Sequence, residues 1–80
     1  MQKILERKDI FRFLEKRKLL NQYKKAKQYL LSGNFLKVKF KLKQPRKHGI
    51  WYFRINKQFR ALSYFDQEGD LIVFKIDNHQ

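Results

Sequence analysis

The sequence predicts an α+β fold in which two N-terminal helices pack on one face of a three- to four-stranded antiparallel sheet. Two observations carry this prediction. Apolar residues recur at helical spacing before Gly33, and after Asn34 they alternate with polar residues at a period of two. At 80 residues, the chain is expected to form one domain, residues 1–80, with a single modest core.

The helical region runs from Asp9 to Leu31. Asp9 is the expected N-cap, and Gly33 lies where many helices end in a left-handed residue. One long helix or a helical hairpin would fit the apolar spacing. We favour two helices broken at residues 16–18, because the apolar residues on either side of that point otherwise leave the shared face. The residues do not decide whether the segment 3–5 forms an opening strand.

The segment 35–43 alternates between apolar and basic residues without a break, which predicts a strand buried on one face. Its other face would carry a row of ammonium groups about 6.5–7 Å apart, which is twice the rise per residue. These groups belong to Lys37, Lys39, Lys41 and Lys43. A basic turn that contains Arg46, Lys47 and His48 should follow.

Three more strands are predicted at residues 50–55, 59–65 and 71–77, the last two joined by an acidic hairpin turn. Pairing Ile55 with Phe59 points Arg54 and Arg60 outward and opposite each other. Like charges in that position destabilise a sheet, so a bound phosphate is expected there. The expected inward residues are Trp51, Phe53, Ile55, Phe59, Ala61, Ser63, Phe65, Ile72, Phe74 and Ile76. The expected open face carries the four lysines with Tyr52, Arg54, Arg60, Tyr64, Lys75 and His79.

The charge is distributed unevenly along the chain. Between Glu15 and Asp66 there is no acidic residue, whereas fifteen residues are Lys or Arg, and the net formal charge is +13. Such a stretch cannot neutralise itself, and its field should attract a polyanion. Nucleic acid is the first expected partner and an acidic protein the second. An anionic membrane is a weaker third, because no basic helix has a wide apolar face.

Composition argues against several kinds of site. The chain has no Cys, which removes disulfides, thiolate nucleophiles and the usual structural zinc sites. Two His residues and scattered carboxylates leave little for another metal, so neither a metal nor another cofactor is expected. No signal peptide or membrane-spanning apolar run is recognisable, and a cytoplasmic protein is expected.

The expected open face suits phosphodiester chemistry. Two Arg side chains could bind phosphate oxygens and stabilise the extra charge of a phosphorane-like transition state. His79 could transfer a proton near neutral pH, and Tyr52 and Tyr64 could stack on bases. RNA supplies its own nucleophile, the 2′-hydroxyl group. The residues therefore fit a metal-independent ribonuclease.

The segment 50–80 resembles the C-terminal half of toxins of the RelE/ParE superfamily, especially the RelE-like and YoeB-like members. Those proteins read W-x-x-R-I, a tight turn, (H/Y)-R-(L/A)-x-Y, an acidic turn, an apolar strand and a terminal His. The corresponding residues here are Trp51, Arg54, Ile55, Arg60, Tyr64 and His79, with Tyr64 four positions after Arg60 where the pattern has three. Gln80 departs from the terminal Tyr of YoeB-like members. Members with a catalytic Glu carry it shortly before the W-x-x-R-I strand, and residues 43–48 hold no Glu here, so Lys41 or Lys43 would replace that base.

The resemblance implies a toxin of a type II toxin–antitoxin system that cleaves mRNA in the decoding site of the 30S ribosomal subunit and is neutralised by an acidic antitoxin. It implies that Arg60 stabilises the scissile phosphate, that His79 transfers a proton and that Arg54 supports both. The expected RNA-binding residues are Lys37, Lys39, Lys41, Lys43, Arg46, Lys47, Tyr52 and Tyr64. Two alternatives stay open: a ParE-like toxin that inhibits DNA gyrase, which would not need His79, and a non-catalytic RNA- or ribosome-binding module.

Overall fold

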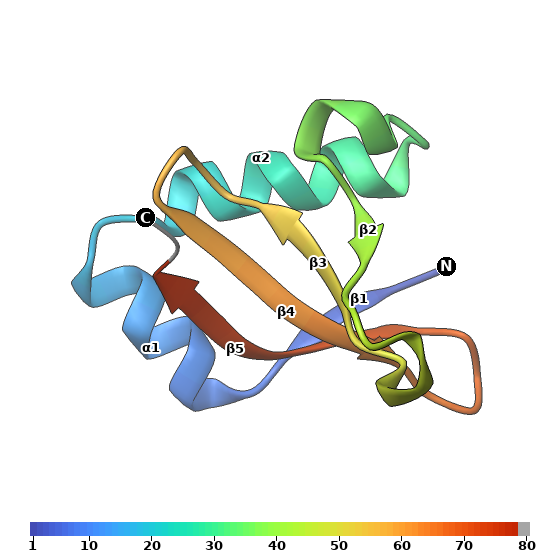
Figure 1. Ribbon diagram of the computed structural model, residues 1–80. Helices are drawn as coiled ribbons and strands as arrows, with labels where there is room; N and C mark the ends of the chain where they lie inside the picture. Colours follow the sequence, from blue (N-terminus) through green and yellow to red (C-terminus); the bar gives the residue numbers. More distant parts are fainter. Residues whose placement is uncertain (79–80) are drawn as a thin grey trace.

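The computed structural model describes residues 1–78 and has helices on one side of a five-stranded sheet (Figure 1). Its strands follow the order β1-β5-β4-β3-β2, in which β1 and β5 are parallel and all other neighbours are antiparallel. This confirms the α+β prediction, with more strands than the three to four expected. The elements are β1 (Ile4–Glu6), α1 (Lys8–Lys16), α2 (Leu20–Leu31), the 3₁₀ helix η1 (Phe35–Val38), β2 (Lys41–Leu42), the 3₁₀ helix η2 (Arg46–His48), β3 (Trp51–Arg54), β4 (Phe59–Phe65) and β5 (Leu71–Asn78).

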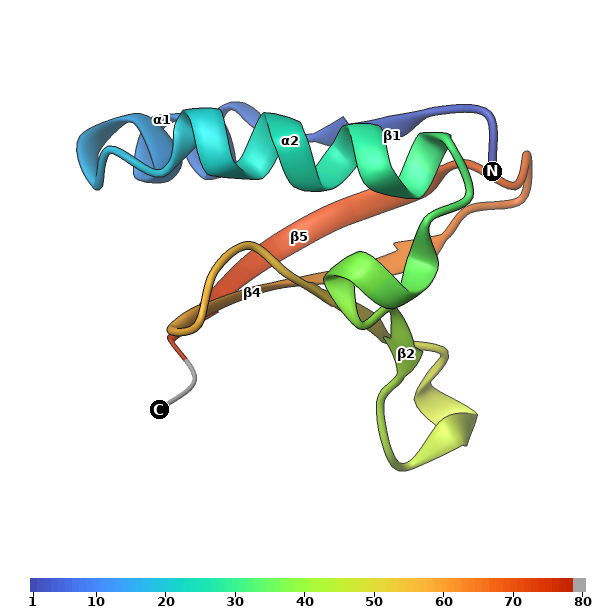
Figure 2. The same cartoon turned by 90° about the horizontal axis from the view of Figure 1, so that it is seen from above.

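Both α-helices cover the same face of the sheet, and the opposite face has no helix over it within residues 1–78 (Figure 2). The core lies between these two layers. Its most deeply buried members come from both: Leu14, Tyr23 and Leu30 from the helices, and Phe53, Ala61, Leu71 and Val73 from the strands. No helix in this part of the chain is long and apolar enough to cross a membrane.

The predicted break between the two helices is confirmed, and both helices end in the same way. After α2, Gly33 has φ +83°, and the amides of Gly33 and Asn34 donate back to Leu30 and Tyr29. After α1, Lys18 takes the corresponding left-handed position with φ +58°. The glycine adopts this conformation readily, whereas the lysine is strained in it.

The predicted N-cap at Asp9 is wrong. The first helix begins at Lys8 with Arg7 as its N-cap, so Asp9 lies inside the first turn. There its carboxylate accepts a hydrogen bond from the Arg7 side chain at 3.0 Å instead of capping a backbone amide. A carboxylate in the first turn still interacts favourably with the positive end of the helix dipole.

The predicted strand at residues 35–43 is largely wrong. Residues Phe35–Val38 form η1, Lys39 has φ +52°, and only Lys41–Leu42 pair as a strand. The chain direction after α2 explains the difference, because the turn at Gly33 returns the segment along the helix. Val38 is then buried against the core, while Leu36 is 93% exposed.

The predicted phase of the last strand is also wrong in its first half. An irregularity in the β4–β5 pairing places Ser63 opposite Val73 but Leu62 opposite Lys75. The extra residue shifts the alternation, so Leu71 and Val73 enter the core, where they are fully buried, in place of Ile72 and Phe74. After the bulge Ile76 packs against the core, as predicted.

The first strand is tied to the second helix by side chains. Glu6 accepts hydrogen bonds from the Tyr23 hydroxyl at 3.1 Å and from the Lys27 ammonium at 3.2 Å. Burial raises the pKa of the Tyr23 phenol far above its usual value, and the Glu6 charge adds to the effect. These contacts hold β1 at one edge of the sheet. The sequence had left open whether this opening strand forms.

Candidate nucleic-acid interface

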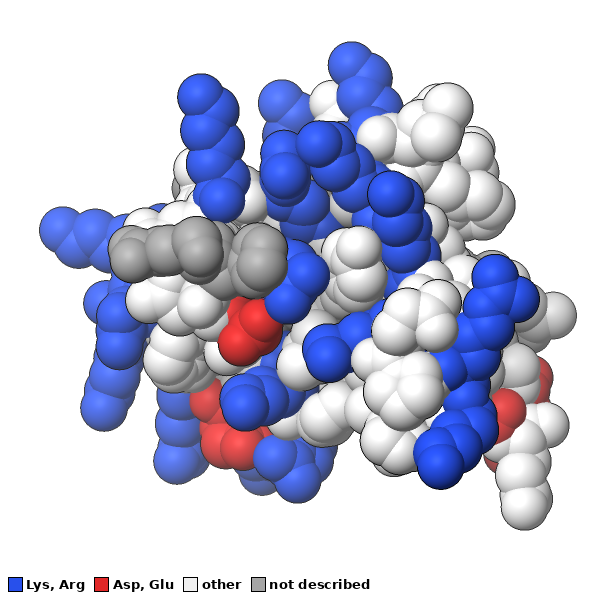
Figure 3. Space-filling view, in the orientation of Figure 1, with Lys and Arg blue, Asp and Glu red and all other residues white. Residues whose placement is uncertain are grey.

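The helix-free face of the sheet carries the residues that the hairpin register turns away from the helices. Arg54 lies opposite Arg60, as predicted, and Arg60 lies opposite Asp77 on the next strand. Two residues before Arg54 on β3, Tyr52 pairs with Leu62 of β4 on one side and with Lys41 of β2 on the other. Lys and Arg side chains gather over and around this face, with few acidic groups among them (Figure 3).

The Arg60 guanidinium is held by two neighbours on this face. Its Nη2 donates to the Asp77 carboxylate at 3.0 Å, and its central carbon lies 4.6 Å from the centre of the Tyr52 ring. Its Nε is buried and has no hydrogen-bond partner among residues 1–78. The side chain is 19% exposed, so a phosphate could reach only part of it. These contacts fix the orientation of the Arg60 guanidinium before any ligand binds, and the Asp77 carboxylate balances part of its positive charge.

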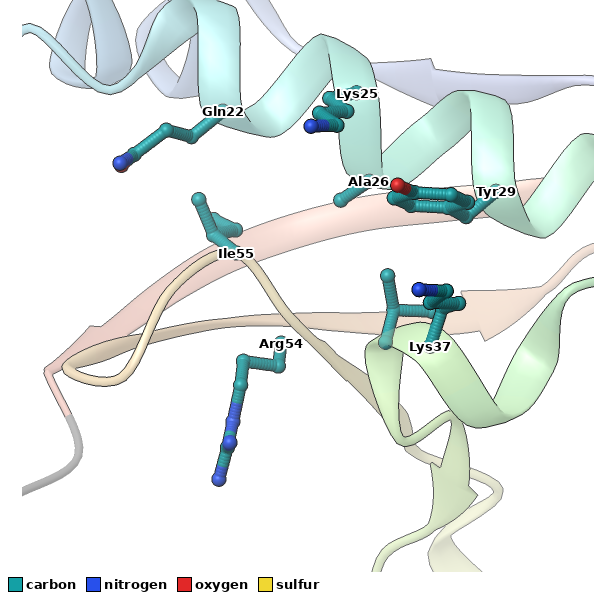
Figure 4. A pocket seen from close by; sticks show the side chains of 8 residues that line it. Gln22, Lys25, Ala26, Tyr29, Lys37, Arg54 and Ile55 are labelled. Carbon is teal, nitrogen blue, oxygen red and sulfur yellow. The ribbon is translucent and has the colours of Figure 1, made fainter.

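Arg54 differs from Arg60 in its surroundings. It forms no ion pair within the described part of the chain, and its side chain extends away from α2 (Figure 4). Two guanidinium groups thus lie on adjacent strands, with one carboxylate to balance them. The remaining positive charge favours binding of an anion at this position.

The predicted row of four lysines is wrong, because only part of the segment is a strand. Lys41 pairs with Tyr52 and shares its face. Lys37 lies on η1, and Lys39 ends that helix in a left-handed conformation. Lys43 follows β2 and donates its backbone amide to Ile50 at 2.7 Å. These four residues therefore do not form one continuous surface.

The two expected base-stacking tyrosines lie in different environments. Tyr52 stacks on the Arg60 guanidinium, within the charged half of the face. Tyr64 contacts Phe74, with 5.9 Å between ring centres, and lies opposite Ile72. The bulge in β5 thus gives the helix-free face an apolar half, which contains Tyr64 and which the predicted register did not show.

The other predicted site residues lie further away or cannot be placed. Arg46, Lys47 and His48 form η2, an exposed turn before β3. Lys75 lies opposite Leu62 on the helix-free face. His79 lies outside the described residues, so its predicted place beside the two arginines stays a prediction.

Sequence reasoning missed a pocket beside β3, on the side of the sheet that the helices cover. The pocket has a volume of about 300 Å³ and opens between α2, η1 and β3 (Figure 4). Its lining residues are Gln22, Lys25, Ala26, Tyr29, Lys37, Val38, Arg54 and Ile55. Three of them (Gln22, Lys25 and Tyr29) follow one another at steps of three and four, which places them on one helix face. This helical spacing of polar residues was the sequence signal that could have indicated the α2 wall of the pocket.

The acidic turn between β4 and β5 has a structural explanation. Asp66, Glu68 and Asp70 have carboxylate oxygens within 4.8 Å of one another. Asp66 Oδ1 accepts hydrogen bonds from the amides of Glu68 and Asp70 at 3.0 and 2.9 Å, which fixes the turn. These carboxylates lie beyond the apolar half of the sheet, away from the arginines.

No protein-family model matches the sequence, and a search of curated proteins finds no significant match. The resemblance to RelE/ParE-superfamily toxins therefore stays a prediction that depends on the motif residues alone.

Proposed function

We propose that this protein is the toxin of a type II toxin–antitoxin system and that it acts in the cytoplasm as a metal-independent, ribosome-dependent mRNA endoribonuclease. The observation that carries the proposal is the register of Arg54 opposite Arg60 on the helix-free face. Two guanidinium groups on adjacent strands suit the oxygens of one phosphodiester. The W-x-x-R-I and R-A-L-x-Y segments that supply them also carry the family resemblance.

In the proposed reaction the 2′-hydroxyl oxygen attacks the adjacent phosphorus, and the bond to the 5′-oxygen of the next nucleotide breaks. The products are a 2′,3′-cyclic phosphate and a 5′-hydroxyl end. Arg60 and Arg54 would stabilise the added negative charge on the phosphoryl oxygens. The 2′-hydroxyl group loses its proton as the new bond forms, and the leaving 5′-oxygen takes up a proton to give the 5′-hydroxyl end. His79 is proposed as a group that transfers a proton in this exchange, on the basis of the resemblance.

A second candidate function is a non-catalytic RNA-binding module, which would use the same positive field without chemistry. The Arg60–Asp77 ion pair favours it, because an arginine that already has a carboxylate partner is less available to a transition state. The two candidates share their ligand, and they differ in whether the RNA is cut.

The decisive experiment is to map mRNA 5′ ends in cells shortly after expression of the protein is induced. The proposal expects new 5′-hydroxyl ends within coding regions, which disappear with Arg60→Ala. Growth arrest without new RNA ends, accompanied by DNA breaks, would overturn it in favour of gyrase inhibition. RNA binding without cleavage or arrest would overturn it in favour of a binding module. Co-purification with an acidic antitoxin would test the partner separately.

A further inference from the structure

We propose that the pocket between α2, η1 and β3 binds one phosphate-bearing nucleotide of the RNA strand, with Lys25 and Lys37 as its phosphate ligands. The identity of the strand as RNA rests on the proposed function. The pocket itself is argued from its shape, its charge and its position relative to Arg54.

The pocket is large enough for part of a nucleotide. Its volume of about 300 Å³ lies at the lower end of the roughly 300–1,000 Å³ typical of small-molecule sites. Ala26, Val38 and Ile55 supply an apolar floor, and each of them is buried in the core. Such a floor suits a sugar or a base edge, whereas the polar groups lie around the rim.

The charge of the pocket calls for an anion. Lys25 and Lys37 line it from α2 and η1, Arg54 borders it with its guanidinium turned away from α2, and no carboxylate lines it (Figure 4). None of these three residues takes part in an ion pair within residues 1–78. Cations that share one concave surface repel one another, and a bound phosphate would remove that repulsion.

Two contacts already order the rim of the pocket. The Gln22 amide oxygen accepts a hydrogen bond from Asn56 at 2.9 Å, which links α2 to the turn after β3. The Lys37 ammonium lies 5.9 Å from the centre of the Tyr29 ring. The close view shows Lys25 extending from α2 and Lys37 from η1, with Tyr29 on the helix beside them (Figure 4). A ligand would therefore meet groups from two elements that are already fixed.

The pocket is continuous with the helix-free face across the edge of the sheet. The short strand β2 pairs only with Trp51 and Tyr52, so no strand covers β3 beyond Tyr52 in the described chain. Arg54 lines the pocket, and in register it also lies opposite Arg60. An RNA strand held at the arginines could pass over this uncovered edge and place its next nucleotide in the pocket.

The test combines nuclear magnetic resonance with matched variants. Titration of the whole protein with adenosine 5′-monophosphate is expected to shift the amide signals of Lys25, Tyr29, Lys37 and Val38. Adenosine without phosphate should shift them at least fivefold less at equal concentration. Shifts of the same size with inorganic phosphate and with the nucleotide would overturn the nucleotide assignment, as would the absence of shifts at millimolar concentrations.

The second arm uses a short single-stranded oligoribonucleotide to separate a free nucleotide from the RNA strand. The Lys25→Ala/Lys37→Ala double variant is expected to lower affinity about tenfold and to reduce the log–log salt slope by about 0.7, because the two lysines share one phosphate. The matched control is Lys8→Ala/Lys24→Ala, which removes two exposed helical lysines that do not line the pocket. Equal losses in both double variants would overturn the proposal.

The inference and the proposed function can fail separately. If the oligonucleotide binds through Lys25 and Lys37 but no RNA is cut in cells, the endoribonuclease proposal fails and the pocket stands. If cells show RNA cleavage and the Lys25→Ala/Lys37→Ala protein binds RNA like the wild type, the pocket proposal fails and the endoribonuclease stands. A shift of the pocket signals by the free nucleotide without an effect of the double variant on RNA binding would assign the pocket to a free nucleotide instead.

Discussion

Arg60 donates a hydrogen bond from its Nη2 to the Asp77 carboxylate at 3.0 Å, across two neighbouring strands of the helix-free face. The residue expected to meet the scissile phosphate thus already has an anionic partner. A phosphate that binds Arg60 must either displace this carboxylate or share the guanidinium with it. Under the proposed function we therefore expect Asp77 to limit the affinity of this face for RNA.

Removal of that limit should tighten RNA binding. Asp77→Asn keeps the shape of the side chain and removes its charge, so we expect about three- to tenfold higher affinity for a single-stranded oligoribonucleotide, or ~0.7–1.4 kcal/mol. Fluorescence anisotropy at fixed salt measures this. Glu68→Gln is the control, because it changes the net charge equally in an exposed turn. Equal gains in both variants would show that Asp77 has no specific effect.

Loss of Arg60 should abolish growth arrest. The guanidinium supplies charge in the proposed site, so Arg60→Ala is expected to leave cells growing at the rate of uninduced cells. Circular dichroism checks the fold, since Asp77 loses its partner. Arg12→Ala, on the exposed surface of α1, removes the same charge elsewhere. A folded Arg60→Ala protein that still arrests growth at wild-type potency would place the site elsewhere.

Arg54 should contribute one phosphate contact. Because a single-stranded nucleic acid releases about 0.7 counterion per neutralised phosphate, Arg54→Ala is expected to make the log–log salt slope of RNA binding shallower by about 0.7. Affinities measured at several salt concentrations give the slope. Arg12→Ala should leave it within error of the wild type. A slope that Arg54→Ala does not change would exclude a direct contact between Arg54 and phosphate.

The end of α1 offers a gain in stability. Lys18 has φ +58° in the position that Gly33 occupies after α2. Lys18→Gly should raise the free energy of unfolding by about 1 kcal/mol, or about 4–8 °C in Tm, because glycine is unstrained there. The reverse change, Gly33→Ala, should lower stability by a similar amount, since nothing lies within 4 Å of an added Cβ and only the backbone is strained. Thermal unfolding that shows no gain for Lys18→Gly would contradict this explanation.

Tyr23 should make the protein less stable in alkali. The pKa of its phenol is raised by burial and by Glu6 in the folded protein. Below the unfolded-state value of about 10 both states keep the proton, and above it only the unfolded state releases the proton readily. Stability should therefore fall by up to ~1.4 kcal/mol per pH unit above pH 10 because of this one group.

The Tyr23→Phe variant isolates that effect from other titrating groups. At pH 8 the substitution should cost about 1–3 kcal/mol, because Glu6 loses a hydrogen-bond donor. The cost should shrink as the pH rises above 10, and urea unfolding at several pH values measures it. Tyr64→Phe controls for removal of an exposed phenol. A cost that stays constant up to pH 11 would contradict the assignment.

Much of the fold could be predicted, because its helices and longest strands bury one face each. The change of period near Gly33 gave the order of the layers, and β4 has the predicted limits. Residues 35–43 were misassigned because their direction depends on packing against α2, which a local alternation cannot reveal. The bulge in β5 was missed for a related reason, since a single extra residue leaves both phases of an apolar strand equally plausible.

The candidate site also has a part that the sequence could predict and a part that it could not. The hairpin turn between β3 and β4 is short, so it determines the facing of Arg54 and Arg60, and that pairing was predictable. The alternation of β5 places Asp77 on the same face as Arg60, so their pairing could be expected. The length of the ion pair and the burial of the guanidinium depend on the packing of the folded chain. The pocket could not be foreseen, because its lining residues come from α2, η1 and β3 and come together only in the folded chain.

The parallel pairing of β1 with β5 has a consequence for synthesis. Ile4 pairs with Leu71, and the Leu71 amide donates to the Lys3 carbonyl at 3.0 Å, so this edge of the sheet cannot form on a nascent chain until β5 has left the ribosomal exit tunnel. Asp77 arrives with that same strand. Until then Arg60 lacks its carboxylate partner and β1 lacks the strand that it pairs with, so the sheet is completed only after β5 has emerged.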